Sequence, residues 1–118
     1  MKNRVIMQGE VYVCDMGDVI GSEQNGIRPS LVVSVDVLNR TSLNIVVLPI
    51  TSKMKKVQPF HKLLSQEKYP FLKYKMNTVL CENIKSISKD RINQYLGRID
   101  DDDLEDILKL KEFVFKEV

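Results

Sequence analysis

A polar stretch at residues 21–30, GSEQNGIRPS, places an arginine and a carboxylate between two expected strands. Arg28 offers a planar fork of donors that fits two phosphate oxygens, and Glu23 could accept a proton as a general base. Pro29 favours an extended backbone at Arg28, and Gly26 permits a tight turn before it. The connection runs to about a dozen residues instead of the two to five of a hairpin, so we expect a functional loop here.

A second set of candidates follows the β-branched run that ends in LPITS at residues 48–52. Thr51 could donate its hydroxyl to a phosphate oxygen, although a hydroxyl at a strand end more often caps backbone. Ser52 is a weaker candidate for the same role. Three lysines come next and could bind flanking phosphates, which would add affinity without sequence choice. They are Lys53, Lys55 and Lys56.

The charge of the chain is uneven although its net value is only +2. Residues 1–99 carry fifteen Lys and Arg against eight Asp and Glu, while residues 100–118 carry three against eight. The richest basic segment runs from residue 52 to residue 75. A basic body suits a polyanion such as a nucleic acid, whereas the plainer interpretation is a solvated lysine-rich surface.

Composition predicts one globular domain over residues 1–118 and no membrane contact. The chain is 43% hydrophobic and 29% charged, as is usual for such domains. No apolar run approaches the ~20 residues that span a bilayer, and residues 1–10 lack a signal-peptide core. We therefore expect a cytoplasmic protein.

The metal-binding residue types are sparse. His61 is the one histidine, and Cys14 and Cys81 form no CxxC motif. A zinc site within one chain is not expected, and we predict no metal and no cofactor. Both cysteines are expected to be reduced and packed as small hydrophobic side chains, and His61 to be structural.

The hydrophobic pattern predicts a mainly β fold with one C-terminal helix. Four aspartates at residues 100–103 suit a helix N-terminus, and the apolar residues after them follow helical spacing over a face wider than one stripe. A turn is expected at residues 36–41. Consecutive short strands favour a strongly bent antiparallel sheet or small barrel. The expected strands are 9–15, 30–35, 42–50, 60–64, 77–84 and 93–99.

Three of these segments, in this order, resemble motifs of the MazF/PemK/Kid toxins of bacterial toxin–antitoxin pairs. They are GSEQNGIRP at 21–29, LPITS at 48–52 and ENIKSISKDRI at 82–92. The resemblance extends from about Gln8 to about Lys116. The family often has Gln where this chain has Asn83, one methylene shorter, which we expect to tune substrate contacts.

The resemblance implies a metal-independent, sequence-selective endoribonuclease that cuts single-stranded mRNA. It also implies an SH3-like barrel, a homodimer, and neutralisation by a cognate antitoxin with an acidic, partly disordered segment. Attack by the RNA 2′-hydroxyl on the adjacent phosphate would leave 2′,3′-cyclic phosphate and 5′-hydroxyl ends. The implied catalytic residues are Arg28, Thr51 and Glu23. The implied RNA-binding residues are Gln24, Asn25, Ser52, Lys53, Lys55, Lys56, Asn83 and Lys85.

Several alternatives remain open on the sequence alone. A CcdB-like toxin on the same fold would trap DNA gyrase without catalysis, and a plain RNA-binding barrel would bind RNA and leave it whole. Either Glu23 or Arg28 could act as the general base. Tyr69, Phe71 and Tyr74 could stack on bases or simply pack their own loop.

Overall fold

The computed structural model describes residues 4–17, 26–53 and 56–115. Seven strands, two α-helices and one 3₁₀ turn (η1, Lys89–Arg91) follow one another along this part of the chain. The strands are β1 (Glu10–Asp15), β2 (Ile27–Val32), β3 (Asn44–Thr51), β4 (His61–Ser65), β5 (Met76–Leu80), β6 (Lys85–Ser88) and β7 (Ile92–Arg98). The helices are α1 (Asp36–Thr41) and α2 (Asp101–Phe115). The mainly β fold with a C-terminal helix is confirmed.

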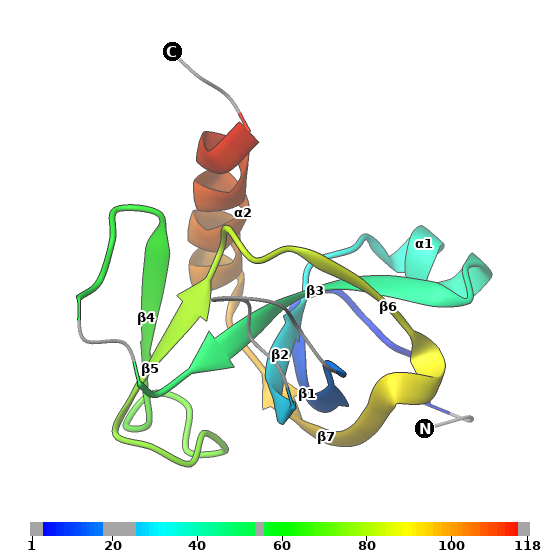
Figure 1. The fold of residues 1–118 in the computed structure, drawn as a ribbon, viewed down its shortest axis with the longest axis horizontal. Coiled ribbons are helices and arrows are strands. Elements are labelled where there is room, and N and C mark those ends of the chain that lie inside the picture. Colours follow the sequence, from blue (N-terminus) through cyan, green and yellow to red (C-terminus); the bar gives the residue numbers. More distant parts are fainter. Residues whose placement is uncertain (1–3, 18–25, 54–55, 116–118) are drawn as a thin grey trace.

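The strands form one antiparallel sheet in the order β4-β5-β3-β2-β1-β7, with β6 added against β3. The long strand β3 is its centre. Its first half pairs with β6 and its last two residues, Ile50 and Thr51, pair with β5, while β2 lies along its other edge. The sheet therefore bends at β3 into a small barrel-like shape, with β4 and β5 on one side and α1 and β6 on the other (Figure 1).

The hydrophobic core lies on both faces of this bent sheet. Val11 and Leu31 belong to a cluster covered by α2, whereas their neighbours Tyr12 and Val32 belong to a second cluster on the opposite face. This alternation is what a period-2 strand produces when both faces are buried. Both cysteines, Cys14 and Cys81, are free and fully buried, as the sequence predicts. Burial raises the pKa of Cys14 to about 11 and that of Cys81 to about 12.

Helix α2 begins as the run of aspartates predicts. Asp100 caps it, because its Oδ1 accepts the backbone N–H of Asp103 at 2.8 Å. Leu104 and Ile107 are buried against the sheet, but the distal end leaves Phe113 58% and Phe115 72% exposed. The apolar face of the helix is thus wider than the sheet covers. Of the described helices, none is long and apolar enough to cross a membrane.

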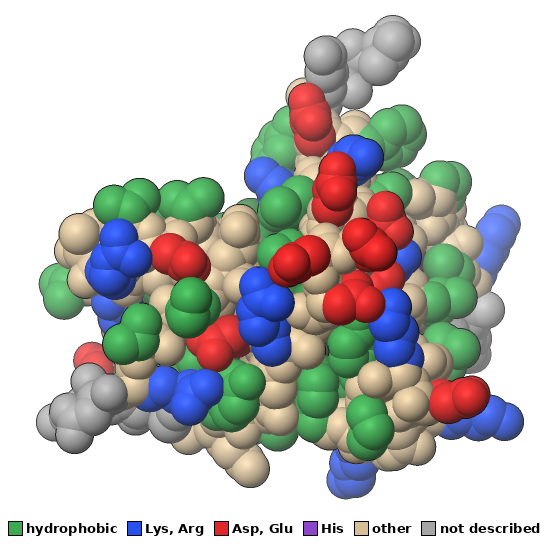
Figure 2. All heavy atoms as spheres, turned by 180° about the vertical axis from the view of Figure 1, so that it is seen from behind, with side chains coloured by type: hydrophobic (Ala, Val, Ile, Leu, Met, Phe, Trp, Pro, Cys, Tyr) green, Lys and Arg blue, Asp and Glu red, His purple; other side chains and the backbone are tan. Residues whose placement is uncertain are grey.

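Ion pairs fasten α2 to the β4 side of the molecule. Lys62 Nζ lies 2.9 Å from Asp106 Oδ2 and 3.3 Å from Asp103 Oδ1. Lys68 Nζ lies 2.8 Å from Asp100 Oδ2 and 2.9 Å from Asp103 Oδ2. Figure 2 shows acidic side chains gathered on one face of the molecule with Lys and Arg side chains between them.

Residues 36–41 form helix α1, so the predicted turn is wrong. The asparagine expected to make the turn, Asn39, is buried instead, and its Nδ2 donates to the Ser34 carbonyl at 2.9 Å. Thr41 Oγ1 donates back to the Val37 carbonyl at 2.8 Å. Side-chain bonds that favour a turn in isolation here stabilise one short helix.

The strand boundaries differ from the prediction most clearly in two places. The predicted strand 77–84 ends at Leu80, and a separate strand, β6, begins at Lys85 and pairs with β3. Strand β2 begins at Ile27, so Arg28 lies within a strand, opposite Cys14 of β1, and not in the preceding loop.

Candidate functional site

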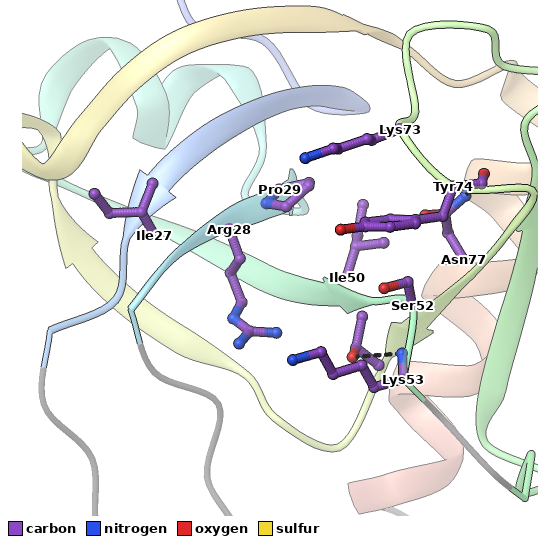
Figure 3. Close-up of a pocket in the computed structure, with 10 residues that line it drawn as sticks. Ile27, Arg28, Pro29, Ile50, Ser52, Lys53, Lys73, Tyr74 and Asn77 are labelled. Atoms are coloured by element: carbon purple, nitrogen blue, oxygen red, sulfur yellow. Dashed lines mark hydrogen bonds between the residues drawn. The ribbon is translucent and has the colours of Figure 1, made fainter.

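A cavity of about 450 Å³ opens where the start of β2, the end of β3 and the β4–β5 connection meet (Figure 3). Its lining combines three cations, three hydroxyls, one amide and several apolar groups. The lining residues are Ile27, Arg28, Pro29, Ile50, Thr51, Ser52, Lys53, Lys73, Tyr74 and Asn77. None of these described lining residues is a carboxylate.

Arg28 reaches this cavity from strand β2. Pairing of its backbone with Cys14 and the fixed φ of Pro29 hold the strand extended at this point. Figure 3 shows the guanidinium extending beside the cavity toward Lys53. Burial lowers the pKa of Arg28, yet an arginine keeps its proton in a protein. The result is a partly desolvated positive charge, which attracts an anion more strongly than one in bulk water.

Thr51 is the last residue of β3, where its backbone pairs with Thr78 of β5. Its side chain is only 7% exposed, and Oγ1 accepts the backbone N–H of Lys53 at 3.2 Å. The hydroxyl therefore caps the chain after the strand while its own proton stays available to an acceptor in the cavity. The two sequence interpretations of Thr51 are compatible in this geometry.

The two residues after Thr51 also line the cavity. Ser52 directs its hydroxyl inward and Lys53 extends toward Arg28 in Figure 3. Lys56 is exposed but does not line this cavity. Of the remaining candidates, Lys55 lies outside the described residues, as do Glu23, Gln24 and Asn25 of the β1–β2 connection.

The β4–β5 connection supplies the opposite wall. Of its three aromatic residues, Tyr69 is buried, with its hydroxyl donating to Asp103, and Phe71 packs on the core against Gly97. Only Tyr74 lines the cavity, 50% exposed, with Lys73 Nζ 5.6 Å from its ring centroid. The sequence alone left all three open to stacking.

Comparison of the sequence with known protein families and with curated proteins identifies the family of this chain. Residues 7–113 match the family of PemK-like, MazF-like toxins of type II toxin–antitoxin systems. The chain belongs to this family. The curated Endoribonuclease EndoA of Bacillus subtilis is 34% identical over 99 residues, which is 83% of this chain and 84% of EndoA. The resemblance drawn from the sequence is confirmed.

Solved structures show that the PemK/MazF fold extends over nearly the whole chain. MazF from Deinococcus radiodurans superposes with a TM-score of 0.81 at 23% identity, covering 96% of this chain and 98% of that one. A mycobacterial endoribonuclease in complex with its cognate antitoxin gives a TM-score of 0.76 at 24% identity, covering 93% and 94%. The predicted barrel-type fold is thereby confirmed.

Asn83 and Lys85, both predicted to bind RNA, lie apart from the Arg28 cavity in this PemK/MazF chain. With Glu82 and Ile84 they line a smaller hollow of about 300 Å³, and the backbone of Lys85 pairs with Val47. The structure therefore joins Arg28, Thr51, Ser52 and Lys53 in one site but does not add the 83–85 segment to it.

His61 does not line the cavity either. Its Nδ1 accepts the backbone N–H of Gln58 at 2.9 Å, which leaves the proton on Nε2, 2.9 Å from Glu82 Oε2. Both ring nitrogens are thus engaged within a buried side chain. Ile50 and Asn77 line the cavity but were not singled out from the sequence, because no motif distinguishes them from other strand residues.

Proposed function

We propose that this toxin is an endoribonuclease that cuts single-stranded mRNA in the Arg28 cavity and so stops translation and growth. The observation that supports it best is that Arg28 and Thr51, far apart in the sequence, line one cavity together with Lys53. The name of the Bacillus subtilis relative points to the same activity. A cationic cavity with a buried hydroxyl suits a phosphodiester of a flexible strand.

The proposed reaction is attack by the 2′-hydroxyl on the adjacent phosphorus. The O2′–P bond forms, the P–O5′ bond breaks, and the products are a 2′,3′-cyclic phosphate and a 5′-hydroxyl. Arg28 stabilises the charge that develops on the phosphoryl oxygens, and Thr51 donates its hydroxyl to one of them. We assign removal of the 2′ proton to Glu23, because Arg28, the other candidate base, keeps its proton and supplies charge instead. The leaving O5′ takes up one proton.

The lining chemistry supports a metal-independent route. Magnesium is bound through oxygen ligands, usually including carboxylates. The described lining offers cations, hydroxyls and an amide in their place. In this proposal Arg28, Lys53 and Lys73 supply the positive charge.

A cognate antitoxin is the proposed regulator. The mycobacterial and Deinococcus radiodurans relatives have been solved as complexes with an antitoxin or MazE. We propose that an acidic, partly disordered segment of such a partner covers residues 22–28 and 53–56 and excludes RNA. Simultaneous binding of antitoxin and a non-cleavable RNA at undiminished affinity would contradict this.

A homodimer is proposed from the exposed end of α2. Phe113, Val114 and Phe115 are 58%, 37% and 72% exposed, and an isologous interface is the commonest way to bury such a patch. Light scattering that gives a monomer at micromolar concentration would contradict it.

The test of the proposed function is incubation of purified protein with a long RNA in EDTA, followed by mapping of the new ends. Cleavage at defined sites with 5′-hydroxyl ends is expected. If the RNA is bound in a salt-dependent manner but stays whole, the protein is an RNA-binding protein without catalysis.

A further inference from the structure

The β4–β5 connection is held by an unusual set of hydrogen bonds from one glutamine. Gln66 Nε2 donates to the carbonyls of Leu72 at 2.8 Å and Lys73 at 3.1 Å, and the Gln66 backbone N–H donates to the Lys75 carbonyl at 3.0 Å. One residue thus fixes three carbonyls across the connection. These bonds restrain the backbone on both sides of residue 74.

Asn77 completes the set. Its Nδ2 donates to the Tyr74 carbonyl at 2.9 Å and to the Leu64 carbonyl of β4 at 3.3 Å, and the side chain is only 3% exposed. A buried amide with two partners has little freedom to move. Together with Gln66 it holds four consecutive carbonyls, those of residues 72–75.

The side chains of the β4–β5 connection differ in their exposure, although its backbone is held by hydrogen bonds throughout residues 72–75. Tyr69 and Leu72 are buried and Phe71 packs on the core, whereas the ring of Tyr74 is half exposed beside the cavity. Figure 3 shows this ring projecting over the cavity between Lys73 and Ser52. The backbone that carries the ring is fixed, and the ring itself remains open to a partner.

We infer that Tyr74 is the stacking platform for one RNA base next to the scissile phosphate, and that Gln66 and Asn77 are positioning residues that hold it. This rests on the proposed function and deepens it, because it places a base contact in a site whose other groups bind phosphate. Unpaired bases stack on aromatic side chains, and a fixed ring loses little entropy when a base arrives. Lys73, beside the ring, is placed for the phosphate of the stacked nucleotide.

The test uses a short RNA that contains one mapped cleavage site, with each base near that site replaced in turn by an abasic ribonucleotide. Single-turnover cleavage is measured for the wild type, Tyr74→Ala and Tyr74→Phe. Tyr74→Ala is expected to lower kcat/KM about 5- to 150-fold on the intact RNA, the range found for one stacked base, and Tyr74→Phe to stay near wild type. Met76→Ala is the matched control, because Met76 is 48% exposed on β5 and does not line the cavity.

The abasic series decides whether the loss is due to a base. At one position the abasic RNA should be cut equally by the wild type and by Tyr74→Ala, because the partner of the ring is gone. A loss that persists at every abasic position would overturn the inference. An unchanged rate for Tyr74→Ala, or a changed oligomeric state with no base dependence, would overturn it too.

Gln66→Ala tests the positioning role. It should lower cleavage of the intact RNA by less than Tyr74→Ala does and leave cleavage of the decisive abasic RNA unchanged. Gln94→Ala, an exposed glutamine on β7, is the control and should behave as wild type. Equal losses on intact and abasic RNA would show that Gln66 has a merely structural role and does not position Tyr74 for a base.

Binding to a 2′-deoxy, non-cleavable RNA separates this inference from the proposed function. If the wild type cuts no RNA in EDTA, the proposed function fails, while the Tyr74-dependent affinity for this probe still reports on the platform. If the wild type cuts RNA and Tyr74→Ala binds the probe as tightly as wild type does, the platform alone fails.

Discussion

Two groups of lysines from one basic stretch of sequence have opposite surroundings. Lys62 and Lys68 face α2 and pair with its aspartates. Lys53 and Lys73 line the Arg28 cavity, and within the described part of the chain neither forms an ion pair. The sequence shows a single basic segment, whereas the fold divides it into a structural half and a half available to an anion.

The pKa shifts of the two paired lysines and of Arg28 have opposite signs. Hydrogen bonds to Asp100 and Asp103 raise the pKa of Lys68, and hydrogen bonds to Asp106 and Asp103 raise that of Lys62 against the opposing effect of burial. At the cavity the shift has the other sign, because burial lowers the pKa of Arg28. A pairing aspartate stabilises the charge of each lysine, whereas partial burial strengthens the attraction of Arg28 for an incoming phosphate. The comparison teaches that neighbours, not the local count of charges, decide which cations serve a ligand.

The largest effect is expected from Arg28→Ala, which removes the central charge of the cavity. Cleavage should slow by about 10²- to 10³-fold, as for the loss of one transition-state donor. Arg28→Lys should recover only part of the rate, because an ammonium lacks the two-pronged geometry. Single-turnover assays measure this, with circular dichroism and Arg40→Ala, an exposed arginine on α1, as controls. A folded Arg28→Ala protein that cuts at the wild-type rate would remove Arg28 from the mechanism.

A pair of lysine variants tests the division directly. Lys53→Ala should reduce the salt dependence of RNA binding, with the slope of log K against log salt falling by about 0.7, and leave the thermal midpoint unchanged. Lys62→Met should leave that slope unchanged and cost about 0.5 to 1 kcal/mol of unfolding free energy, the range of partly screened ion pairs. Salt titrations and urea melts on both variants measure this. An exchange of the two outcomes would reverse the assignment.

The smallest expected effect is a loss of thermal stability at acidic pH. Burial alone would raise the pKa of Asp103, but hydrogen bonds from Tyr69, Lys68 and Lys62 lower it overall. A carboxylate with a lowered folded pKa adds stability above its unfolded value of about 3.9, and that stability is lost as pH falls through the folded pKa. We therefore expect the midpoint to be steady from about pH 7 to 5 and to fall below about pH 4.

Asp103→Asn isolates this contribution. It should lower the thermal midpoint at pH 7, and its difference from wild type should shrink as the pH falls below 4, because the wild-type carboxyl then also becomes neutral. Asp102→Asn, in the exposed first turn of α2, is the control. A difference that is constant with pH would show that Asp103 stabilises the helix without its charge.

Much of the fold could be predicted because its signals are local. Strands β1 and β3 alternate or run apolar over their length, and the aspartates before Leu104 mark the start of α2. Helix α1 could not be predicted, since it depends on the contact of Asn39 with Ser34, and strand β6 is a four-residue segment held by pairing with β3. Tertiary contacts overrode weak local preferences in both cases.

The candidate site divides in the same way. Arg28, Thr51 and Lys53 were predicted from motifs and do line one cavity. The predicted segment around Asn83 and Lys85 lies at a different hollow, because Lys85 pairs with β3 at Val47, away from Thr51. The separation of Val47 from Thr51 along β3 keeps the two hollows apart, and no motif in the sequence encodes this separation.

The burial of Cys14 and Cys81 has a practical consequence. Both thiols are fully enclosed, and their raised pKa values keep them protonated at neutral pH, so neither should be modified by maleimide or iodoacetamide in the folded protein. The two native cysteines should therefore not interfere with labelling of an introduced cysteine. A cysteine introduced at Met76, which is 48% exposed, would be the one thiol open to a fluorescent dye. A dye there would report the arrival of RNA at the neighbouring Tyr74 in real time, without altering the ring.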